Sequence, residues 1–223
     1  MILSTSFLLY PPMTPSEQRN DLLAAKVVKS LKNRHFDAYY CKTSDEAAQL
    51  VLSLIPEGES VSWGGSQTVQ HLGLPEKLHA GNYEVFDRDL AKDDEEKQRI
   101  YRAVFSCNTY LTSMNAISED GQLVNVDGNG NRVAAITFGP KQVIVVAGIN
   151  KIVKSLEDAV VRARTIASPI NVQRFSLNTP CKMTGACENC TSSDCICTYV
   201  VTTRISRPAG RIKVVLIGET LGY

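Results

Sequence analysis

The sequence lacks an excess of charge of either sign, and it lacks any long apolar run. Its 24 lysines and arginines nearly balance 23 aspartates and glutamates, which leaves a formal net charge of +1. So weak an overall field attracts neither a polyanion nor an anionic bilayer, and we expect no nucleic acid among its partners. No stretch approaches the roughly 20 apolar residues that cross a bilayer, so we also expect no membrane span.

The start of the chain has no features of a secretory signal. Residues 2–10 are largely apolar, but no basic residue precedes them and no small-residue cleavage site follows. We therefore expect a cytoplasmic protein. A helix-capping pattern begins at Thr14, directly after Met13, which predicts that Met13 is the functional start and that residues 1–12 can be removed at little cost.

Histidine is scarce, and a candidate calcium loop is incomplete. The only histidines are His35, His71 and His79, and they form no His-x-x-x-His pair. The segment that begins at Asp127 (Asp-Gly-Asn-Gly-Asn) offers the first oxygen ligands of a calcium loop. It has Arg132 where glycine is needed and lacks the later bidentate glutamate. We therefore expect a polar turn between two strands at this place.

Capping patterns and apolar runs predict alternating helices and strands. The expected helices cover residues 15–33, 44–55, 66–72, 93–105 and 151–167. The expected strands cover residues 36–41, 60–63, 109–117, 122–126, 142–147, 198–205 and 213–217. Such alternation in 223 residues predicts a single α/β domain over residues 1–223, with a mostly parallel central sheet and helices on both faces.

A turn between a strand and a helix is the first candidate binding site. The strand over residues 60–63 ends in Gly64-Gly65, and Ser66 can cap the helix that follows. Glycines let a ligand approach the backbone, and a helix start presents free N–H groups, so Gly64, Gly65 and Ser66 could hold an anion. The same residues also suit a plain tight turn, because they match neither a phosphate loop nor a dinucleotide fingerprint.

Glu119 is the candidate catalytic residue. It lies in the run Ser118-Glu119-Asp120-Gly121, at a predicted bend between two extended segments. Carboxylates at strand ends are often placed at the mouth of a cleft, where rigid elements hold them. We therefore expect Glu119 to face the turn at residues 64–66. A solvated turn is the competing interpretation, since acidic residues before glycine are common in turns.

A cysteine-rich loop near the C-terminus carries the sharpest chemical signal. Five of the seven cysteines fall between Cys181 and Cys197, whereas Cys41 and Cys107 stand alone. The five are Cys181, Cys187, Cys190, Cys195 and Cys197. Thiolates so dense, in a loop broken by proline and glycine, can surround one metal centre. Zinc usually takes two Cys-x-x-Cys pairs, and this loop has one, so the spacing favours an iron–sulfur cluster over zinc or free thiols.

Several segments together resemble the lactate-utilisation (LUD) domain family, which is related in fold to glucosamine-phosphate isomerase, ribose-phosphate isomerase and CoA-transferases. The resemblance rests on residues 61–66 (VSWGGS), 112–125 (TSMNAISEDGQLVN), 131–133, 139–148 and 167–171. Short members of this type also resemble the chain in Thr179-Pro180-Cys181, in Thr184-Gly185-x-Cys187, in Cys190 and in a last cysteine that matches Cys197.

The resemblance implies a ligand set for the cysteine loop. A 4Fe-4S cluster would be held by Cys181, Cys187, Cys190 and Cys197, with residues 179–198 as the metal-binding loop and zinc as the alternative metal. Cys195 falls where the family would have a basic residue, which makes it the spare thiol.

The resemblance also implies a role in oxidising lactate to pyruvate, together with other iron–sulfur proteins of lactate utilisation. The first hypothesis is therefore an iron–sulfur redox component that acts on lactate or a related hydroxy acid. The second is an enzyme for a sugar phosphate or acyl-CoA that uses Glu119, and the third is a binding module without turnover. Each expects a small-molecule ligand, and all three leave open whether the chain forms a homo-oligomer.

Overall fold

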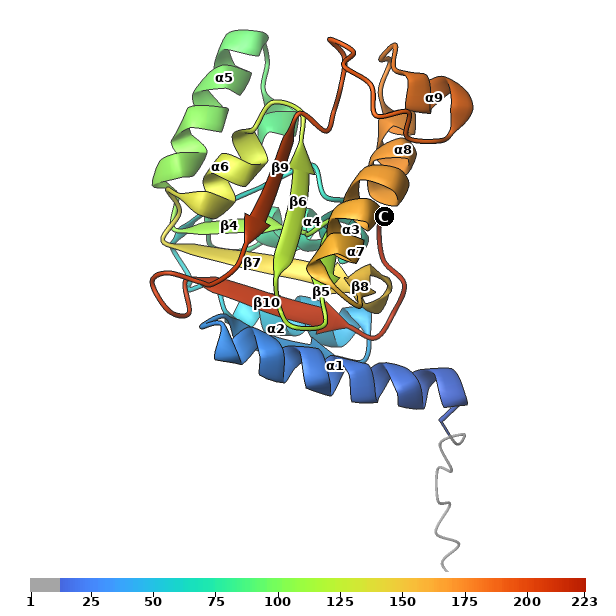
Figure 1. The fold of residues 1–223 in the computed structure, drawn as a ribbon. Coiled ribbons are helices and arrows are strands. Elements are labelled where there is room, and N and C mark those ends of the chain that lie inside the picture. Colours follow the sequence, from blue (N-terminus) through green and yellow to red (C-terminus); the bar gives the residue numbers. More distant parts are fainter. Residues whose placement is uncertain (1–12) are drawn as a thin grey trace, which may run out of the picture.

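The computed structural model describes residues 13–223. Residues 1–12, and with them the expectation that they are dispensable, lie outside this range. The centre of the fold is a parallel sheet of six strands (Figure 1). In spatial order the strands are β1 (Asp37–Cys41), β10 (Ile212–Ile217), β7 (Gln142–Gly148), β4 (Thr109–Thr112), β2 (Ser60–Trp63) and β3 (Glu84–Phe86). The expected α/β class with a mostly parallel sheet is confirmed.

A second sheet of four short strands crosses in front of the first one (Figure 1). Its strands, in spatial order, are β8 (Ile152–Val153), β5 (Ala116–Ser118), β6 (Leu123–Asp127) and β9 (Tyr199–Thr203). The sequence predicted one continuous strand over residues 109–117, and this is wrong. The chain leaves the central sheet after β4, and the Asn115 side chain accepts a hydrogen bond from the Val126 N–H at 3.0 Å, which fixes the new direction.

Nine helices are found within residues 13–223, and α1, α2 and α3 begin where the capping patterns predicted. They are α1 (Pro15–Asn33), α2 (Ser44–Ser53), α3 (Gln67–His71), α4 (Leu74–Ala80), α5 (Asp94–Ala103), α6 (Asn131–Thr137), α7 (Leu156–Arg162), α8 (Ser168–Asn171) and α9 (Pro180–Thr184). Thr14 and Glu17 form the expected capping box at the start of α1, and Thr43 and Ser66 cap α2 and α3. No helix within residues 13–223 is both long and apolar enough to cross a bilayer.

Two further expected elements differ from the structure. The helix predicted over residues 151–167 begins only at Leu156, because Ser155 caps it, and a π-helical turn (Ala163–Ala167) joins α7 to α8. The polar turn at Asp127 leads into α6 and not into another strand. Asp127 accepts hydrogen bonds from the N–H groups of Gly130, Arg132 and Val133, which starts the helix.

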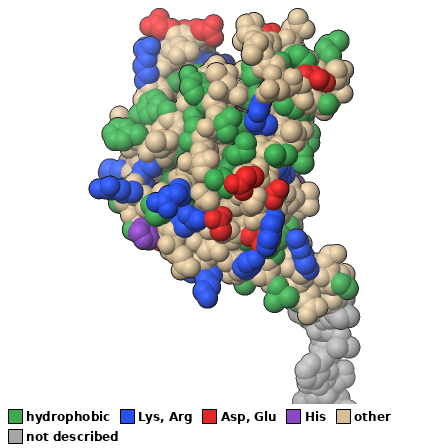
Figure 2. Space-filling view, viewed as in Figure 1, with side chains coloured by type: hydrophobic (Ala, Val, Ile, Leu, Met, Phe, Trp, Pro, Cys, Tyr) green, Lys and Arg blue, Asp and Glu red, His purple; other side chains and the backbone are tan. Residues whose placement is uncertain are grey.

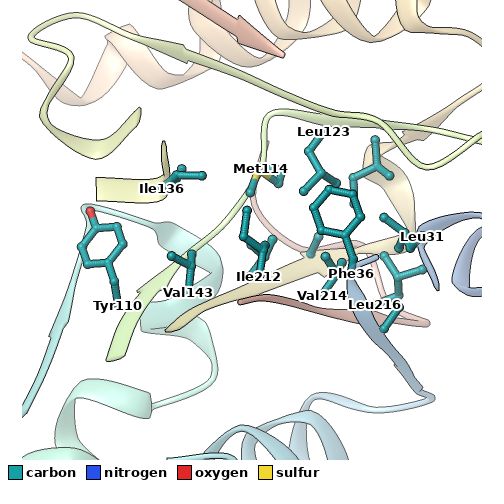
Figure 3. Packing of buried hydrophobic residues seen from close by; sticks show 14 of the residues in the cluster. Leu31, Phe36, Tyr110, Met114, Leu123, Ile136, Val143, Ile212, Val214 and Leu216 are labelled. Atoms are coloured by element: carbon teal, nitrogen blue, oxygen red, sulfur yellow. The ribbon is translucent and has the colours of Figure 1, made fainter. Parts of the chain in front are cut away.

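Both faces of the central sheet are covered by apolar side chains. Along β7, Val143 and Val145 point to one face, and Ile144 and Val146 to the other. The first face packs against α1, α6 and the second sheet, with Leu31 and Met114 among the buried side chains (Figure 3). The second face packs against α2, α3 and α4. Helix α7 covers the outer face of the second sheet.

Candidate functional site

A cavity of about 450 Å³ opens at the carboxyl ends of the central strands. Gly65 and Ser66 follow β2, Ser113 follows β4, and Lys151 follows β7 by three residues. Open α/β sheets bind ligands at this edge, because the strand ends leave a crevice between the connecting loops. The position therefore makes this cavity the principal candidate for a ligand site.

The cavity has more cationic than anionic side chains. The charged residues that line it are Arg88, Arg132, Lys151, Arg174, Asp127 and Asp194. Asp194 accepts a hydrogen bond from the Asn178 N–H at 2.8 Å, which anchors the cysteine loop, and Asp127 serves the start of α6. The cavity thus has four cationic side chains and two carboxylates, and both carboxylates already accept hydrogen bonds from backbone N–H groups. This excess of positive charge favours an anionic ligand.

The hydrogen bonds of Arg132 hold the second sheet in place. Its guanidinium donates to the Ser113 and Val126 carbonyl oxygens and to the side-chain oxygens of Asn115 and Asn125, at 2.5–2.9 Å. Its Nε lies 3.8 Å from the Asp127 carboxylate. Because all these partners are protein groups, Arg132 positions the cavity wall and has few donors left for a ligand.

Two other guanidinium groups lie beside the glycine turn. Arg174 Nη1 donates to the Gly65 carbonyl oxygen at 3.1 Å, and Arg88 Nη2 would lie only 2.6 Å from a Cβ placed on Gly65. Glycine at this position is thus what lets Arg88 approach the backbone. Within residues 13–223, Arg174 has no carboxylate within ion-pair distance.

Two of the three residues of the expected ligand-binding turn line the cavity, and whether they bind a ligand stays a prediction. Gly65 and Ser66 line the cavity, but Gly64 does not, because its N–H donates to the Leu111 carbonyl oxygen and its Cα faces Tyr110 and Arg132. Sequence reasoning missed Lys151 and the three arginines. For Arg88 and Lys151 the available signal is a position two or three residues after a strand end, whereas Arg132 and Arg174 lie in helical segments and offer no such signal.

All five clustered cysteines line a second, smaller cavity. It is bounded by Cys181, Cys187, Cys190, Cys195 and Cys197, together with Arg164, Ser168, Thr179, Glu188 and Ile196. The elements around it are α8, α9 and the loop that leads to β9, which lie together at one end of the molecule (Figure 1). Cys41 and Cys107 are buried in the apolar cores instead. The structure therefore brings the sequence-predicted ligands together and keeps the other two thiols away.

The loop is shaped by local hydrogen bonds. Gly185 ends α9 in the left-handed conformation (φ +75°), and Asn189 also has a positive φ of 49°. Arg164 Nη2 donates to Asn189 Oδ1 at 2.5 Å, which ties the loop to the π-helical turn. The positive charge of Arg164 acts to lower the pKa of Cys197, but burial outweighs this effect.

Two of the five sulfurs lie close together. Cys195 Sγ and Cys197 Sγ lie 3.3 Å apart, and all five thiols are free. Burial, followed by the hydrogen bond with Cys195, raises the pKa of Cys197 to about 12. No three His, Cys, Asp or Glu side chains of residues 13–223 converge closely enough to hold one metal ion. Four cysteine thiolates are the usual ligand set of a 4Fe-4S cluster, so the donor atoms suit such a centre. The volume that they enclose is about 10 Å³, room for little more than one water molecule, so the loop would have to open to hold a metal centre.

The two cavities share a wall. Ser168, Cys195 and Ile196 line both of them. A ligand in the cationic cavity would therefore lie next to whatever the cysteines hold. This adjacency could not be read from the sequence, because the shared residues lie far along the chain from the glycine turn.

Glu119 lies elsewhere, and the expectation that it faces the glycine turn is wrong. It does not line the cavity. Its carboxylate pairs with Lys26 of α1 at 2.5 Å and with Lys154 at 3.0 Å. The turn packs tightly on α1, since a Cβ on Gly121 would lie 2.8 Å from the Ser30 backbone. Whether Glu119 takes part in any reaction stays a prediction.

Glu119→Gln should change ligand binding and iron content by less than about twofold, as surface substitutions outside a site usually do. Hydrogen bonds from Lys26, and then from Lys154, hold the pKa of Glu119 below its ordinary value. The stabilisation that these contacts give is present above the ordinary pKa and is lost as the pH falls through the lowered one. The melting-temperature difference between wild type and variant should therefore shrink on acidification. A strong loss of ligand binding in Glu119→Gln would show that Glu119 does belong to the ligand site.

The outer face of the molecule shows no single-sign field. Acidic and basic side chains alternate over the face drawn in Figure 2, in keeping with a formal net charge of +1. A face that carries both signs does not favour a polyanion, whereas the excess of cationic side chains around the cavity favours a small anionic ligand.

Comparison with known proteins gives one family and one similar fold. A search of curated proteins found no match. A DUF162 family protein from Deinococcus radiodurans superposes with a TM-score of 0.51 at 10% identity, over 93% of this chain and 100% of that chain. Initiation factor eIF2B beta from Chaetomium thermophilum gives a TM-score of 0.37 at 18% identity, over 52% of this chain and 44% of that one.

A third solved structure, 5-methylthioribose 1-phosphate isomerase from Pyrococcus horikoshii OT3, gives a TM-score of 0.33 at 13% identity, over 71% of this chain and 50% of that one. Of these three structures, the DUF162 family protein is similar enough to support the fold assignment. At 10% identity, this similarity concerns the fold alone. The family model described as "LUD domain" matches residues 24–217.

Proposed function

This chain belongs to the LUD domain family, whose model matches residues 24–217, and from that premise we propose that it is an iron–sulfur redox component acting in the oxidation of lactate or a related hydroxy acid. The observation that carries the proposal is the wall shared by the cationic cavity and the cysteine cavity. An acid held in the first would lie beside a redox centre held in the second.

The cysteine cavity would hold the redox centre. Cys181, Cys187, Cys190 and Cys197 would bind a 4Fe-4S cluster as thiolates, and Cys195 would stay free. When bound, such a cluster accepts and passes on one electron at a time. Arg164 supports this assignment, because its positive charge at the cavity wall offsets part of the negative charge of four thiolates.

The substrate would be a small carboxylic acid in the cationic cavity. Arg88 and Arg174 at the glycine turn can orient a carboxylate, and Arg132 keeps the wall of the second sheet in place. Oxidation of a 2-hydroxy acid to the 2-oxo acid releases two electrons and two protons. Since one cluster passes on a single electron at a time, the partners that accept both electrons would be other iron–sulfur proteins of lactate utilisation, and the protons would pass to solvent. An enzyme for a sugar phosphate or acyl-CoA acting through Glu119 has less support, because Glu119 does not line the cavity.

The proposal is tested by metal analysis of protein purified without oxygen. We expect about four irons and four acid-labile sulfides per chain, as a 4Fe-4S cluster contains. After reduction with dithionite, L-lactate should alter the electron paramagnetic resonance spectrum, because the two cavities share a wall. Glycerol, which is similar in size but uncharged, should leave the spectrum unchanged. About one zinc and no iron per chain would contradict the proposal.

A further inference from the structure

Lys151 is a buried amine at the edge of the cationic cavity. The residue is 3% exposed and follows β7, one of the two central strands of the six-stranded sheet. Its Nζ donates to Ser113 Oγ at 2.7 Å and to Thr68 Oγ1 at 3.2 Å. Both partners are neutral hydroxyls that also line the cavity. Two of the three ammonium donors are thus used, and neither partner supplies a negative charge.

The charges around Lys151 make burial of its ammonium group unfavourable. Arg162 and Arg132 are the cations whose fields act on it, and no carboxylate of residues 13–223 lies within ion-pair distance of its Nζ. Asp127 is engaged by Arg132 and by the start of α6, and Arg162 donates to two backbone carbonyl oxygens. Buried ammonium groups are normally paired, because an uncompensated charge in a low-dielectric site loses its hydration.

Burial, and then the charges of Arg162 and Arg132, lower the pKa of Lys151 to about 7. A methionine would fill the same space without any charge to desolvate, so packing alone does not account for a lysine here. Asp127, Asp194 and the C-terminal residue Tyr223 line the same cavity, but no carboxylate of residues 13–223 pairs with Lys151. An anion that enters the cavity could supply this pairing.

We propose that Lys151 binds the carboxylate of a small 2-hydroxy or 2-oxo acid, and that the ligand supplies the counter-charge that the protein omits. This inference rests on the proposed function and deepens it by naming the binding residue and the ligand class. Thr68 and Ser113 orient the amine, and Arg174 offers a second donor near Gly65.

Binding of the acid should be coupled to protonation of Lys151. A bound carboxylate favours the charged amine and raises its pKa, so the protein takes up a proton where the free amine is partly neutral. Affinity is then highest below pH 7. Above pH 7 it falls by up to about tenfold per unit, until the pKa of the complex is reached.

The test is isothermal titration calorimetry of the full chain, purified anaerobically, with L-lactate, pyruvate and sulfate from pH 6 to 9. All three ligands keep a constant charge over this range, so a pH dependence reports on the protein. Lys151→Met should weaken binding of both acids by at least about tenfold, the usual consequence of losing a hydrogen bond to a charged group. Lys154→Met is the matched control. Lys154 lies three residues further on, is exposed and pairs with Glu119, so its replacement should leave affinity within about twofold.

Removing an unpaired buried charge should not destabilise the fold, so Lys151→Met should melt at the wild-type temperature or above it. If the variant cannot be obtained folded, the wild-type pH profile decides: a fall in affinity above pH 7 supports the inference, and a flat profile overturns it. Wild-type affinity in Lys151→Met, no binding of either acid by the wild type, or binding of sulfate alone would each overturn it.

The same experiment separates this inference from the proposed function. Protein without iron that binds lactate in a Lys151-dependent way would sink the redox role and keep the binding site. If the protein contains a full cluster but Lys151→Met does not change lactate binding, the redox role is kept and the Lys151 binding site is rejected.

Discussion

Cys190→Ser should abolish the 4Fe-4S cluster, leaving almost no iron or brown colour in anaerobically purified protein. The same result is expected for serine at Cys181, Cys187 and Cys197, because a cluster with four cysteine ligands loses one iron–thiolate bond in each variant. All four thiols line one cavity, and α9 and the loop that follows it place them around its wall. The measurement is iron and acid-labile sulfide per chain, with the visible absorption spectrum.

Two cysteine variants serve as controls. Cys195→Ser should keep the cluster, because four other thiols remain around the cavity. Cys107→Ser should keep it as well, because Cys107 is buried in the apolar core and donates to the Thr109 carbonyl oxygen. Cys195 Sγ lies 3.3 Å from Cys197 Sγ, so the two could exchange roles. Loss of iron in Cys195→Ser with retention in Cys197→Ser would show that the ligand assignment within this pair is wrong.

Arg132→Met should destabilise the protein by on the order of 3 kcal/mol, because it removes one partner from a largely buried charged network. The side chain is 19% exposed, and its removal leaves Asp127, Asn115 and Asn125 without their shared donor. For a chain of this size the melting temperature should fall by roughly 6–12 °C. Calorimetry or circular dichroism at neutral pH measures the change.

The control for Arg132 is another arginine of the same cavity. Arg174 is exposed and makes two hydrogen bonds, to Gly65 and Asn171, at 3.1 Å. Arg174→Met should therefore shift the melting temperature by only about 1–2 °C, while it weakens ligand binding. Equal destabilisation by the two substitutions would show that Arg132 does not hold the second sheet, and that the cavity wall is organised by other contacts.

The sequence by itself determined most of the local structure. Thr14, Thr43 and Ser66 start their helices where expected, because a cap depends on residues only three positions apart. The apolar run of β7 indicated a buried central strand for the same local reason. The family resemblance is confirmed by the match over residues 24–217, and the cysteine spacing singled out thiols that share one cavity.

The tertiary structure decided what these elements do together. Residues 109–117 have one extended pattern, but the partners of Asn115 divide them between two sheets. Glu119 has the local sequence of a strand-end carboxylate, yet α1 supplies Lys26 and turns the carboxylate away from the cavity. The hydrogen bonds of Lys151 to Thr68 and Ser113 form because β7, α3 and the loop after β4 meet at one edge of the sheet. Pairing and burial depend on residues distant in the chain, and no local pattern encodes them.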